Sequence, residues 1–335
     1  MNIYIGYDIG AISVNRVIIN STSSCSGQIV DVMPYSRHYG EPVKLILKDI
    51  EEILKKGRFQ KISGIAFTGS GGKNLAGLLG ASFINEIEAI ITAIKFLYPH
   101  VNTVIEIGGQ DSKFIDLAGG DYAMNELCAA GTGSFLDQQA SRFNMRIEEF
   151  CELALRSENP STIAGRCSVF AKSDMIHLQQ EGASDADIAL GLCYAMARSF
   201  KSGIVKGKKF QPPIIFCGGV SFNKAMIRAF EDMLSEKLII PQHQASIGAI
   251  GAALNLVFRG EEMNFDLNQV SAKLSNFLKN FKYQRETFRS LVIEKSKLPA
   301  RNYEKYNFNI MKTNGKKVEA YIGIDVGSIS TNVVA

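Results

Sequence analysis

The sequence has little of what a membrane-spanning or secreted protein requires. No apolar run among its 335 residues approaches the roughly eighteen needed to span a bilayer, and the N-terminal MNIYIGYDIG has no basic region before its apolar residues. The six cysteines have irregular spacings that do not form a secreted disulfide framework. We therefore expect a cytoplasmic protein with reduced thiols and no membrane partner.

Histidine and net charge are also low. The four histidines share no spacing typical of metal ligands, so we expect no histidine metal site. The formal net charge is only +4, and residues 260–320 alone contain twelve Lys and Arg against seven Asp and Glu, a net of +5. The rest of the chain is therefore nearly neutral. This distribution favours a solvated basic connector at 260–320, and we expect no nucleic-acid partner.

The hydrophobic pattern predicts an α/β protein with mixed sheets. With 46% apolar residues the chain can bury a large core, and its length suggests two domains. Strands are predicted from short alternating or continuous apolar runs, and helices from apolar residues at helical spacing. The predicted strands are 3–7, 14–20, 28–33, 62–68, 104–107, 113–117 and 214–217, and the main predicted helices are 43–56, 86–96, 133–142, 147–155, 169–180, 185–205 and 223–234.

Three of the predicted strands are followed by glycine, and acids accompany the glycine at two of them. The residues that follow them are DIG at 8–10, GGQD at 108–111 and GGV at 218–220. Glycine lets backbone N–H groups approach phosphate oxygens, while Asp and Gln side chains bind Mg²⁺ or orient a water. Three such strand ends could converge on one ligand between two lobes.

One cysteine has a context that suggests metal binding. Cys128 precedes Ala-Ala-Gly-Thr-Gly and a predicted helix, and the dipole at a helix N-terminus favours the thiolate that binds metal. A buried core cysteine is the alternative. We expect Cys25, Cys151, Cys193 and Cys217 to serve packing or to lie at the surface.

Six ordered motifs carry a family resemblance that covers residues 3–258. They are YIGYDIG, VIEIGGQDSK, NELCAAGTGSFLDQQA, GRCSVFAKSDMI, FCGGVSFNKAM and QASIGAIGAALN. The chain resembles the ATPase activators of 2-hydroxyacyl-CoA dehydratases and the benzoyl-CoA reductase ATPase subunits, within the actin, sugar kinase and heat-shock ATPase superfamily. The resemblance implies a two-lobed, ribonuclease-H-like (actin-like) ATPase clamp that binds ATP or ADP with Mg²⁺. It also implies dimerisation around one [4Fe-4S] cluster, with two cysteines from each clamp.

The same resemblance implies partners and site residues. ATP hydrolysis would drive a low-potential electron from a donor such as ferredoxin or flavodoxin into a dehydratase or reductase. Gln110, Glu106 and Asp8 would be catalytic, with Gln110 positioning the attacking water, and Mg²⁺ would bind near Asp8, Glu106 and Asp111. The matching nucleotide-binding residues are Gly10, Ala11, Ser13, Gly108, Gly109, Asp111, Gly218, Gly219 and Asn223, and the matching cluster ligands are Cys128 and Cys167.

Some residues depart from the family pattern at the nucleotide site. Ala11 stands where a Ser is usual, Glu106 replaces Asp, and Val14-Asn15-Arg16 lacks the usual Thr and Lys. Turnover would then be slow or lost. Two alternative functions stay open, a small-molecule kinase of the sugar or acetate type and a non-hydrolysing scaffold copy of the ATPase.

An internal repeat predicts the domain organisation. YIGIDVGSISTNVV at 321–334 repeats YIGYDIGAISVNRV at 4–17, at a constant offset of 317 residues. We expect one lobe at 1–100 plus 246–258, a second lobe with the cluster cysteines at 101–245, a basic connector at 259–320 and the truncated start of a second ATPase copy at 321–335. Either that second copy or a homodimer would complete the cluster.

Overall fold

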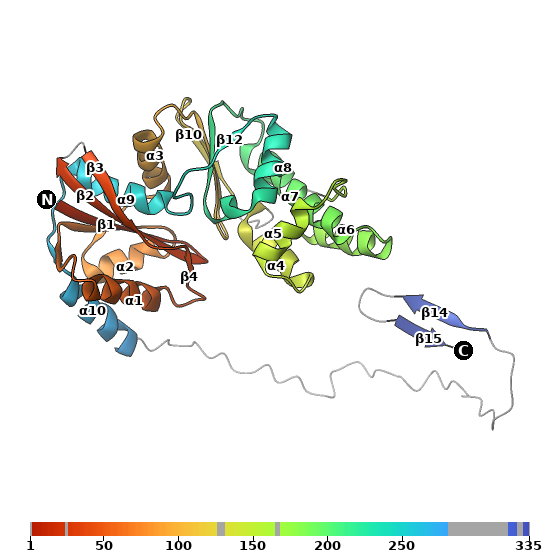
Figure 1. Cartoon of the computed structure of the whole chain (residues 1–335), viewed down its shortest axis with the longest axis horizontal. Helices are drawn as coiled ribbons and strands as arrows, with labels where there is room; N and C mark the ends of the chain where they lie inside the picture. Colours follow the sequence, from red (N-terminus) through yellow and green to blue (C-terminus); the bar gives the residue numbers. More distant parts are fainter. Residues whose placement is uncertain are drawn as a thin grey trace, which may run out of the picture. The chain divides into compact units, whose positions relative to one another are not determined.

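The structure, a computed structural model, describes residues 2–23, 26–125, 131–164, 168–280, 321–326 and 331–334. The chain forms two compact units, Met1–Asn280 and Phe281–Ala335. The first unit contains two larger sheets, each flanked by helices (Figure 1). No helix among the described residues is both long and apolar enough to cross a membrane.

The first large sheet comes from the N-terminal part of the chain. Its strand order is β3-β2-β1-β6-β7, and β4 pairs with β2. β1 pairs antiparallel with β2 and parallel with β6, so the sheet is mixed as predicted. Its strands are β1 (Asn2–Ile9), β2 (Ser13–Ser23), β3 (Ser26–Val32), β4 (Ser36–Arg37), β6 (Gly64–Thr68) and β7 (Ser82–Phe83).

The second large sheet has the strand order β10-β9-β8-β11-β12. β8 pairs antiparallel with β9 and parallel with β11. Its strands are β8 (Thr103–Ile107), β9 (Ser112–Asp116), β10 (Asp121–Met124), β11 (Ile214–Cys217) and β12 (Leu238–Ile239). The short strands β10 and β12 were not predicted, because four or two residues carry too little pattern to identify a strand.

Helices cover both faces of the first sheet because successive side chains along its strands point to opposite faces, and both sets are apolar. Ile5 and Tyr7 of β1 pack with α1 and α2, whereas Tyr4 belongs to the core on the opposite face, with α3 and α9. Gly6 lets α9 approach closely, since a Cβ at this position would lie 2.0 Å from the Ala249 carbonyl oxygen. These helices are α1 (Pro42–Lys55), α2 (Gly72–Leu79), α3 (Glu86–Leu97) and α9 (Ile247–Arg259).

Helices α3 and α9 also join the two sheets. Ile90 and Ile94 of α3 share one buried cluster with Val104 of β8 and Ile215 of β11. A second cluster lies on the other face of the second sheet, where most of the remaining helices pack (Figure 1). They are α4 (Gly133–Arg142), α5 (Ile147–Leu155), α6 (Ser168–Gln180), α7 (Asp185–Phe200), the π-helical turn Lys201–Val205, the 3₁₀ turn η3 (Gly219–Phe222) and α8 (Lys224–Leu234).

Residues 259–280 of the connector expected at 259–320 belong instead to the folded unit, and residues 281–320 lie outside the described residues. β13 (Phe265–Asp266) pairs antiparallel with β5 (Lys61–Ile62), and α10 (Leu267–Asn280) packs against α1. Leu267, Val270 and Leu274 of α10 are buried in the core below the first sheet. Their apolar side chains repeat at helical spacing, so residues through 280 belong to the folded unit and not to a solvated segment.

The second unit contains a hairpin of β14 (Gly323–Val326) and β15 (Thr331–Val334). Its antiparallel register pairs Asp325 with Asn332, which is the pairing of Asp8 with Asn15 shifted by the repeat offset of 317 residues. The repeat in sequence is therefore also a repeat in strand pairing.

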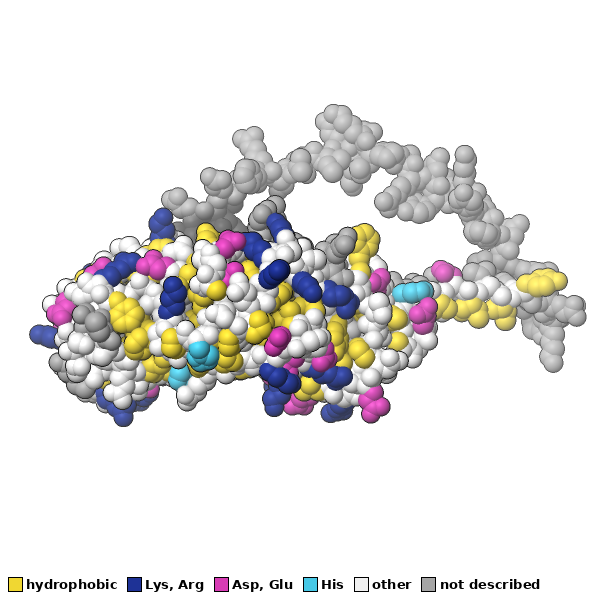
Figure 2. Space-filling model, turned by 90° about the horizontal axis from the view of Figure 1, so that it is seen from above, with side chains coloured by type: hydrophobic (Ala, Val, Ile, Leu, Met, Phe, Trp, Pro, Cys, Tyr) yellow, Lys and Arg dark blue, Asp and Glu magenta, His cyan; other side chains and the backbone are white. Residues whose placement is uncertain are grey.

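On the face shown in Figure 2, Lys and Arg side chains lie among Asp and Glu over the described residues, without a basic stripe.

Candidate functional site

A small cavity of about 60 Å³ lies where strands β1, β8 and β11 end. The structure thus brings the three glycine-containing strand ends to one place. The predicted residues that line this cavity are Asp8, Gly10, Ala11, Ser13, Glu106, Gly108, Gly109, Gln110, Asp111, Gly218 and Gly219. We call it the acidic cavity, because carboxylates from several elements face it.

A buried lysine that the sequence reasoning missed holds two of these acids. Lys113 Nζ lies 2.9 Å from Glu106 Oε2 and 2.9 Å from Glu86 Oε2. Burial acts to lower the pKa of Lys113, but Glu106 and Glu86 outweigh it and raise the pKa. A signal was available: Glu106 of β8 and Lys113 of β9 are direct neighbours in the hairpin register, and they carry opposite charges within largely apolar strands.

Among the residues that the structure describes, no cation forms an ion pair with Asp8. Burial and repulsion from Glu86 and Glu106 raise the pKa of Asp8 to about 7, although Lys113 lowers it somewhat. Burial likewise raises the pKa of Glu106 above its ordinary value, against the opposing effect of Lys113. Perturbed carboxyl groups converging in one cavity are typical of a functional site.

The acidic cavity has the oxygen donors that Mg²⁺ prefers, but few of them converge. In the described part of the chain, no three His, Cys, Asp or Glu side chains are grouped closely enough to hold a metal ion. Mg²⁺ in proteins often binds one or two carboxylates and takes its other ligands from water and substrate phosphates. Asp8 and Asp111 fit that mode of binding.

A larger cavity of about 350 Å³ adjoins the first, and both are lined by Ile12, Gly108, Gly109 and Gly219. Ile12 lies against Gly109, where a Cβ would meet Ile12 Cγ1 at 2.1 Å, so only glycine fits at this junction. We call the larger space the nucleoside cavity, since its size suits a nucleoside. Its other lining residues are Tyr35, Arg37, Gly133, Leu136, Asp137, Ile147, Glu148, Cys151, Val220, Phe222 and Asn223.

Asn223 is the predicted site residue that lines the nucleoside cavity. Its Oδ1 accepts hydrogen bonds from the backbone N–H groups of Ala225 and Met226, which caps the N-terminus of α8. Its Nδ2 has no hydrogen-bond partner among the described residues, although the side chain is buried. An unpaired buried donor beside a cavity is available to a ligand.

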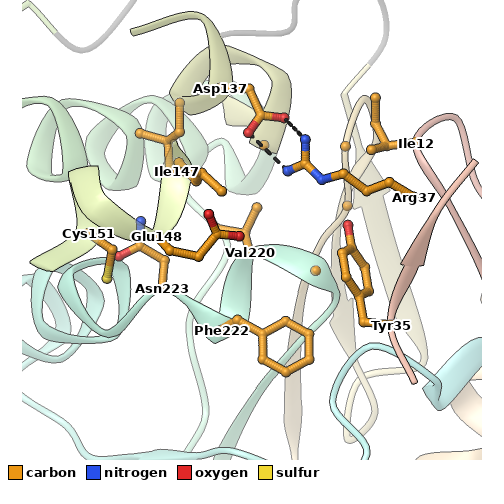
Figure 3. Close-up of a pocket in the computed structure, with 15 residues that line it drawn as sticks. Ile12, Tyr35, Arg37, Asp137, Ile147, Glu148, Cys151, Val220, Phe222 and Asn223 are labelled. Atoms are coloured by element: carbon orange, nitrogen blue, oxygen red, sulfur yellow. Dashed lines mark hydrogen bonds and ion pairs between the residues drawn. The ribbon is translucent and has the colours of Figure 1, made fainter. Parts of the chain in front are cut away.

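Two side-chain contacts cross the nucleoside cavity (Figure 3). Each joins a residue in β4 or just before it to a residue of α4 or of the 3₁₀ turn η3. Arg37 donates to Asp137 from Nη1 and Nη2, at 3.1 Å and 3.0 Å. Tyr35 and Phe222 meet edge to face, with ring centroids 5.6 Å apart. Sequence reasoning missed all four residues, because the partners lie far apart in the chain and Tyr35 and Arg37 belong to a segment without a clear pattern.

The cysteines fall into two groups. Cys128, Cys167 and Cys25 lie outside the described residues. Cys193 and Cys217 are buried, and burial raises the pKa of both thiols, in agreement with a packing role. Cys151 is half-buried and lines the nucleoside cavity, which its helical pattern did not indicate.

The two helix-flanked mixed sheets, with a cavity where their strands end, have the fold of the actin-like ATPases. The chain belongs to the BadF/BadG/BcrA/BcrD ATPase family, and the family match covers residues 5–255. The predicted fold class and family resemblance are therefore confirmed.

Similar proteins include several dehydratase activators. The activator of lactoyl-CoA dehydratase from Anaerotignum propionicum is 32% identical over 256 residues, which is 75% of this chain and 95% of that protein. The 2-hydroxyisocaproyl-CoA dehydratase activator of Clostridioides difficile is 31% identical over 191 residues, 56% of this chain and 71% of that protein.

Solved structures agree with these relatives. The (R)-2-hydroxyglutaryl-CoA dehydratase component A of Acidaminococcus fermentans matches with a TM-score of 0.70 and 27% identity, over 77% of this chain and 99% of that one. The activator of the 2-hydroxyisocaproyl-CoA dehydratase from Clostridium difficile, solved with bound ADPNP, matches with a TM-score of 0.65 and 27% identity, over 84% and 98% of the two chains.

Proposed function

We propose that this chain binds Mg-ATP across the two cavities, hydrolyses it, and uses the reaction to activate a partner dehydratase or related reductase. The observation that carries the proposal is the junction of the two cavities at Gly108, Gly109 and Gly219. A nucleoside in the larger cavity would direct its phosphates along these glycines toward the carboxylates of the smaller one. The relative solved with bound ADPNP supports a nucleotide ligand.

In this proposal Asp8 and Asp111 hold Mg²⁺ and its waters, near Glu106. The metal would neutralise phosphate charge when bound. Gln110 lines the acidic cavity, and its amide orients the attacking water, since an amide cannot take a proton at neutral pH. Glu106, held by Lys113, is fixed in direction and completes the polar surface around the metal's waters.

Calorimetry with Mg-ADP and Mg-ATP, together with phosphate release, tests this proposal. We expect binding of both nucleotides and measurable turnover. Binding without turnover would instead favour the non-hydrolysing scaffold, for which Ala11 in the phosphate loop is the motivating feature. A well-folded protein that binds neither nucleotide would overturn the proposal.

We further propose that Cys128 and Cys167 hold a [4Fe-4S] cluster together with two cysteines of another clamp. Both residues lie outside the described part of the chain, so the support is the sequence motif and the relatives named as dehydratase activators. A bound cluster would supply one low-potential electron to the partner enzyme, after reduction by ferredoxin or flavodoxin.

The second clamp has two sources in this proposal. The first is a tandem copy that begins with the hairpin at 321–334, because that hairpin repeats the β1–β2 register. The second is another copy of this chain, since a shared cluster suits a two-fold interface. A tethered copy would have a local concentration on the order of millimolar and would compete well with a partner at micromolar levels.

A further inference from the structure

The acidic cavity has little positive charge to offer a nucleotide. Its described lining contains the carboxylates of Asp8, Glu86, Glu106 and Asp111 but a single cation, Lys113. Lys113 already bonds two of those carboxylates, so its charge is used within the protein. A nucleoside diphosphate or triphosphate therefore needs a cationic side chain from elsewhere, in addition to Mg²⁺.

Arg37 is the one cationic side chain lining the described nucleoside cavity, and the backbone places it beside the phosphate loop. In the pairing of β2 with β4, Arg37 lies directly opposite Ser13. The next residue, His38, donates its backbone N–H to the Ile12 carbonyl at 3.0 Å, and its Nε2 lies 3.0 Å from the Gly10 carbonyl oxygen. Arg37 is thus held on the turn whose residues line the acidic cavity.

Its present partner is anchored on the opposite side of the same junction. Asp137 lies on α4, whose first residues Gly133 and Ser134 donate backbone hydrogen bonds to the carbonyls of Gly108 and Gly109. Both side chains of the Arg37–Asp137 pair remain about a third exposed, at 32% and 29%. The pair is therefore accessible from the cavity, and Figure 3 shows the guanidinium and the carboxylate facing each other across it.

We propose that Arg37 is the phosphate-binding residue of this cleft and that Asp137 is the carboxylate it leaves when nucleotide binds. A guanidinium forms the same two-pronged hydrogen bonds with phosphate as with a carboxylate, so the exchange costs Arg37 no hydrogen bonds. Asp137 then competes with the ligand and lowers its affinity. This inference rests on the proposed nucleotide binding, and it goes further by assigning the side chain that binds the phosphates.

A purely structural pair would behave differently, and the sign of two substitutions separates the cases. Arg37→Gln should weaken Mg-ADP binding at least roughly tenfold, because a charge-assisted bidentate contact is lost. Asp137→Asn should strengthen Mg-ADP binding severalfold, because the competitor is removed. If the ion pair only held the two elements together, both substitutions would change the affinity for Mg-ADP in the same direction.

The experiment is calorimetric titration of the full chain with Mg-ADP and, separately, with adenosine. Adenosine has no phosphate, so both substitutions should leave its affinity within about twofold. Arg259→Gln is the matched control, because Arg259 forms an ion pair with Glu88 at 2.6 Å away from the cavity lining, and it should change neither affinity. Arg37→Lys keeps the charge but loses the fork, so it should weaken Mg-ADP severalfold even if Arg37→Gln proves poorly folded.

The outcomes are distinguishable from a failure of the proposed function. If the wild type binds neither Mg-ADP nor adenosine, the proposed nucleotide binding is overturned. If the wild type binds Mg-ADP, but the Arg37 and Asp137 variants shift affinity in the same direction or affect adenosine equally, the phosphate role of Arg37 is overturned.

Discussion

Arg16 on β2 forms a buried, two-pronged ion pair with Asp49 on α1. Arg16 Nη2 lies 3.0 Å from Asp49 Oδ1 and Nε lies 3.1 Å from Oδ2, and Tyr7 Oη donates to Asp49 Oδ2 at 2.6 Å. Neighbouring strand residues face opposite sides, so Asn15 lines the acidic cavity whereas Arg16 points into the core behind it. Arg16, which departs from the family pattern, therefore contributes to packing behind the acidic cavity and does not line the cavity.

The first prediction concerns this ion pair. Asp49→Ala should destabilise the protein by about 3 kcal/mol or more, because it leaves the buried Arg16 with only its contact to Asp31. Urea unfolding of the full chain measures the loss. Glu41→Ala, which breaks an exposed pair with Lys44, should change stability by less than about 1 kcal/mol. Nucleotide affinity of folded Asp49→Ala should stay near that of the wild type, and a large selective loss would place this network in the site after all.

The sequence predicted most of the elements that support the site. Helices α4 and α5 and strand β11 have the predicted bounds, because their apolar spacing is regular and glycine or polar residues flank them. Helix α7 was predicted to reach Val205, but the α-helix ends at Phe200 and continues as a π-helical turn. Strand β4 was missed, because two residues have no periodicity to read.

The site was less predictable than the fold, for a physical reason. Glycines and acids at strand ends have a local signature, and the structure places them around one cavity. Contacts such as Arg37 with Asp137, or Lys113 with Glu86, depend on how distant elements pack, and no short stretch of sequence records them. The charge balance of the cleft therefore required the structure.

The second prediction uses the raised pKa of Asp8. Without metal, Asp8 with a pKa of about 7 is largely protonated at pH 6 and must release that proton before it binds Mg²⁺. Mg-ADP affinity should therefore rise with pH between about 6 and 8, approaching tenfold per pH unit at the lower end, and then level off. Calorimetry in buffers of different ionisation enthalpy should detect proton release at pH 6. A flat affinity profile would contradict the assignment of Asp8 to the metal.

The same shift predicts an effect on stability of opposite sign. Because the folded pKa of Asp8 lies above its ordinary value, ionised Asp8 destabilises the metal-free protein, and this cost grows as the pH rises from about 4 to about 7 and then levels off. Asp8→Asn should therefore raise the melting temperature at pH 8 without Mg²⁺, and by less at pH 5. An equal change at both values would mean that ionisation is not the cause.

The third prediction concerns Gln110. Gln110→Ala should lower ATP hydrolysis at least roughly tenfold while leaving nucleotide affinity within a few-fold, because orienting the attacking water contributes mainly to the transition state. Initial rates of phosphate release at saturating Mg-ATP measure the first quantity, and calorimetry measures the second. Gln269→Ala, at an exposed position on α10, is the control. Equal losses of rate and affinity would assign Gln110 to binding.

The last prediction concerns how a cluster would be completed. In the proposal above, Cys128 and Cys167 would supply two thiolates, whereas a [4Fe-4S] cluster normally takes four, so a clamp bearing both would need a second clamp. We expect this chain, handled in air, to be a monomer without iron, since a partly ligated cluster is open to oxidation. Anaerobic reconstitution should instead yield a dimer with about four irons per two chains.

Iron and sulfide content, measured with size-exclusion chromatography, tests the assignment. Cys128→Ser and Cys167→Ser should each reduce both iron content and dimer formation. Cys151→Ser is the matched control, because Cys151 is a free, half-buried thiol that lines the nucleoside cavity and should not bind the cluster. If the first two substitutions leave iron and assembly unchanged, the cluster assignment is wrong. The chain would then be a scaffold or a kinase, and the expected signs of the Arg37 and Asp137 effects on Mg-ADP affinity would still apply, because that proposal involves the nucleotide and not the cluster.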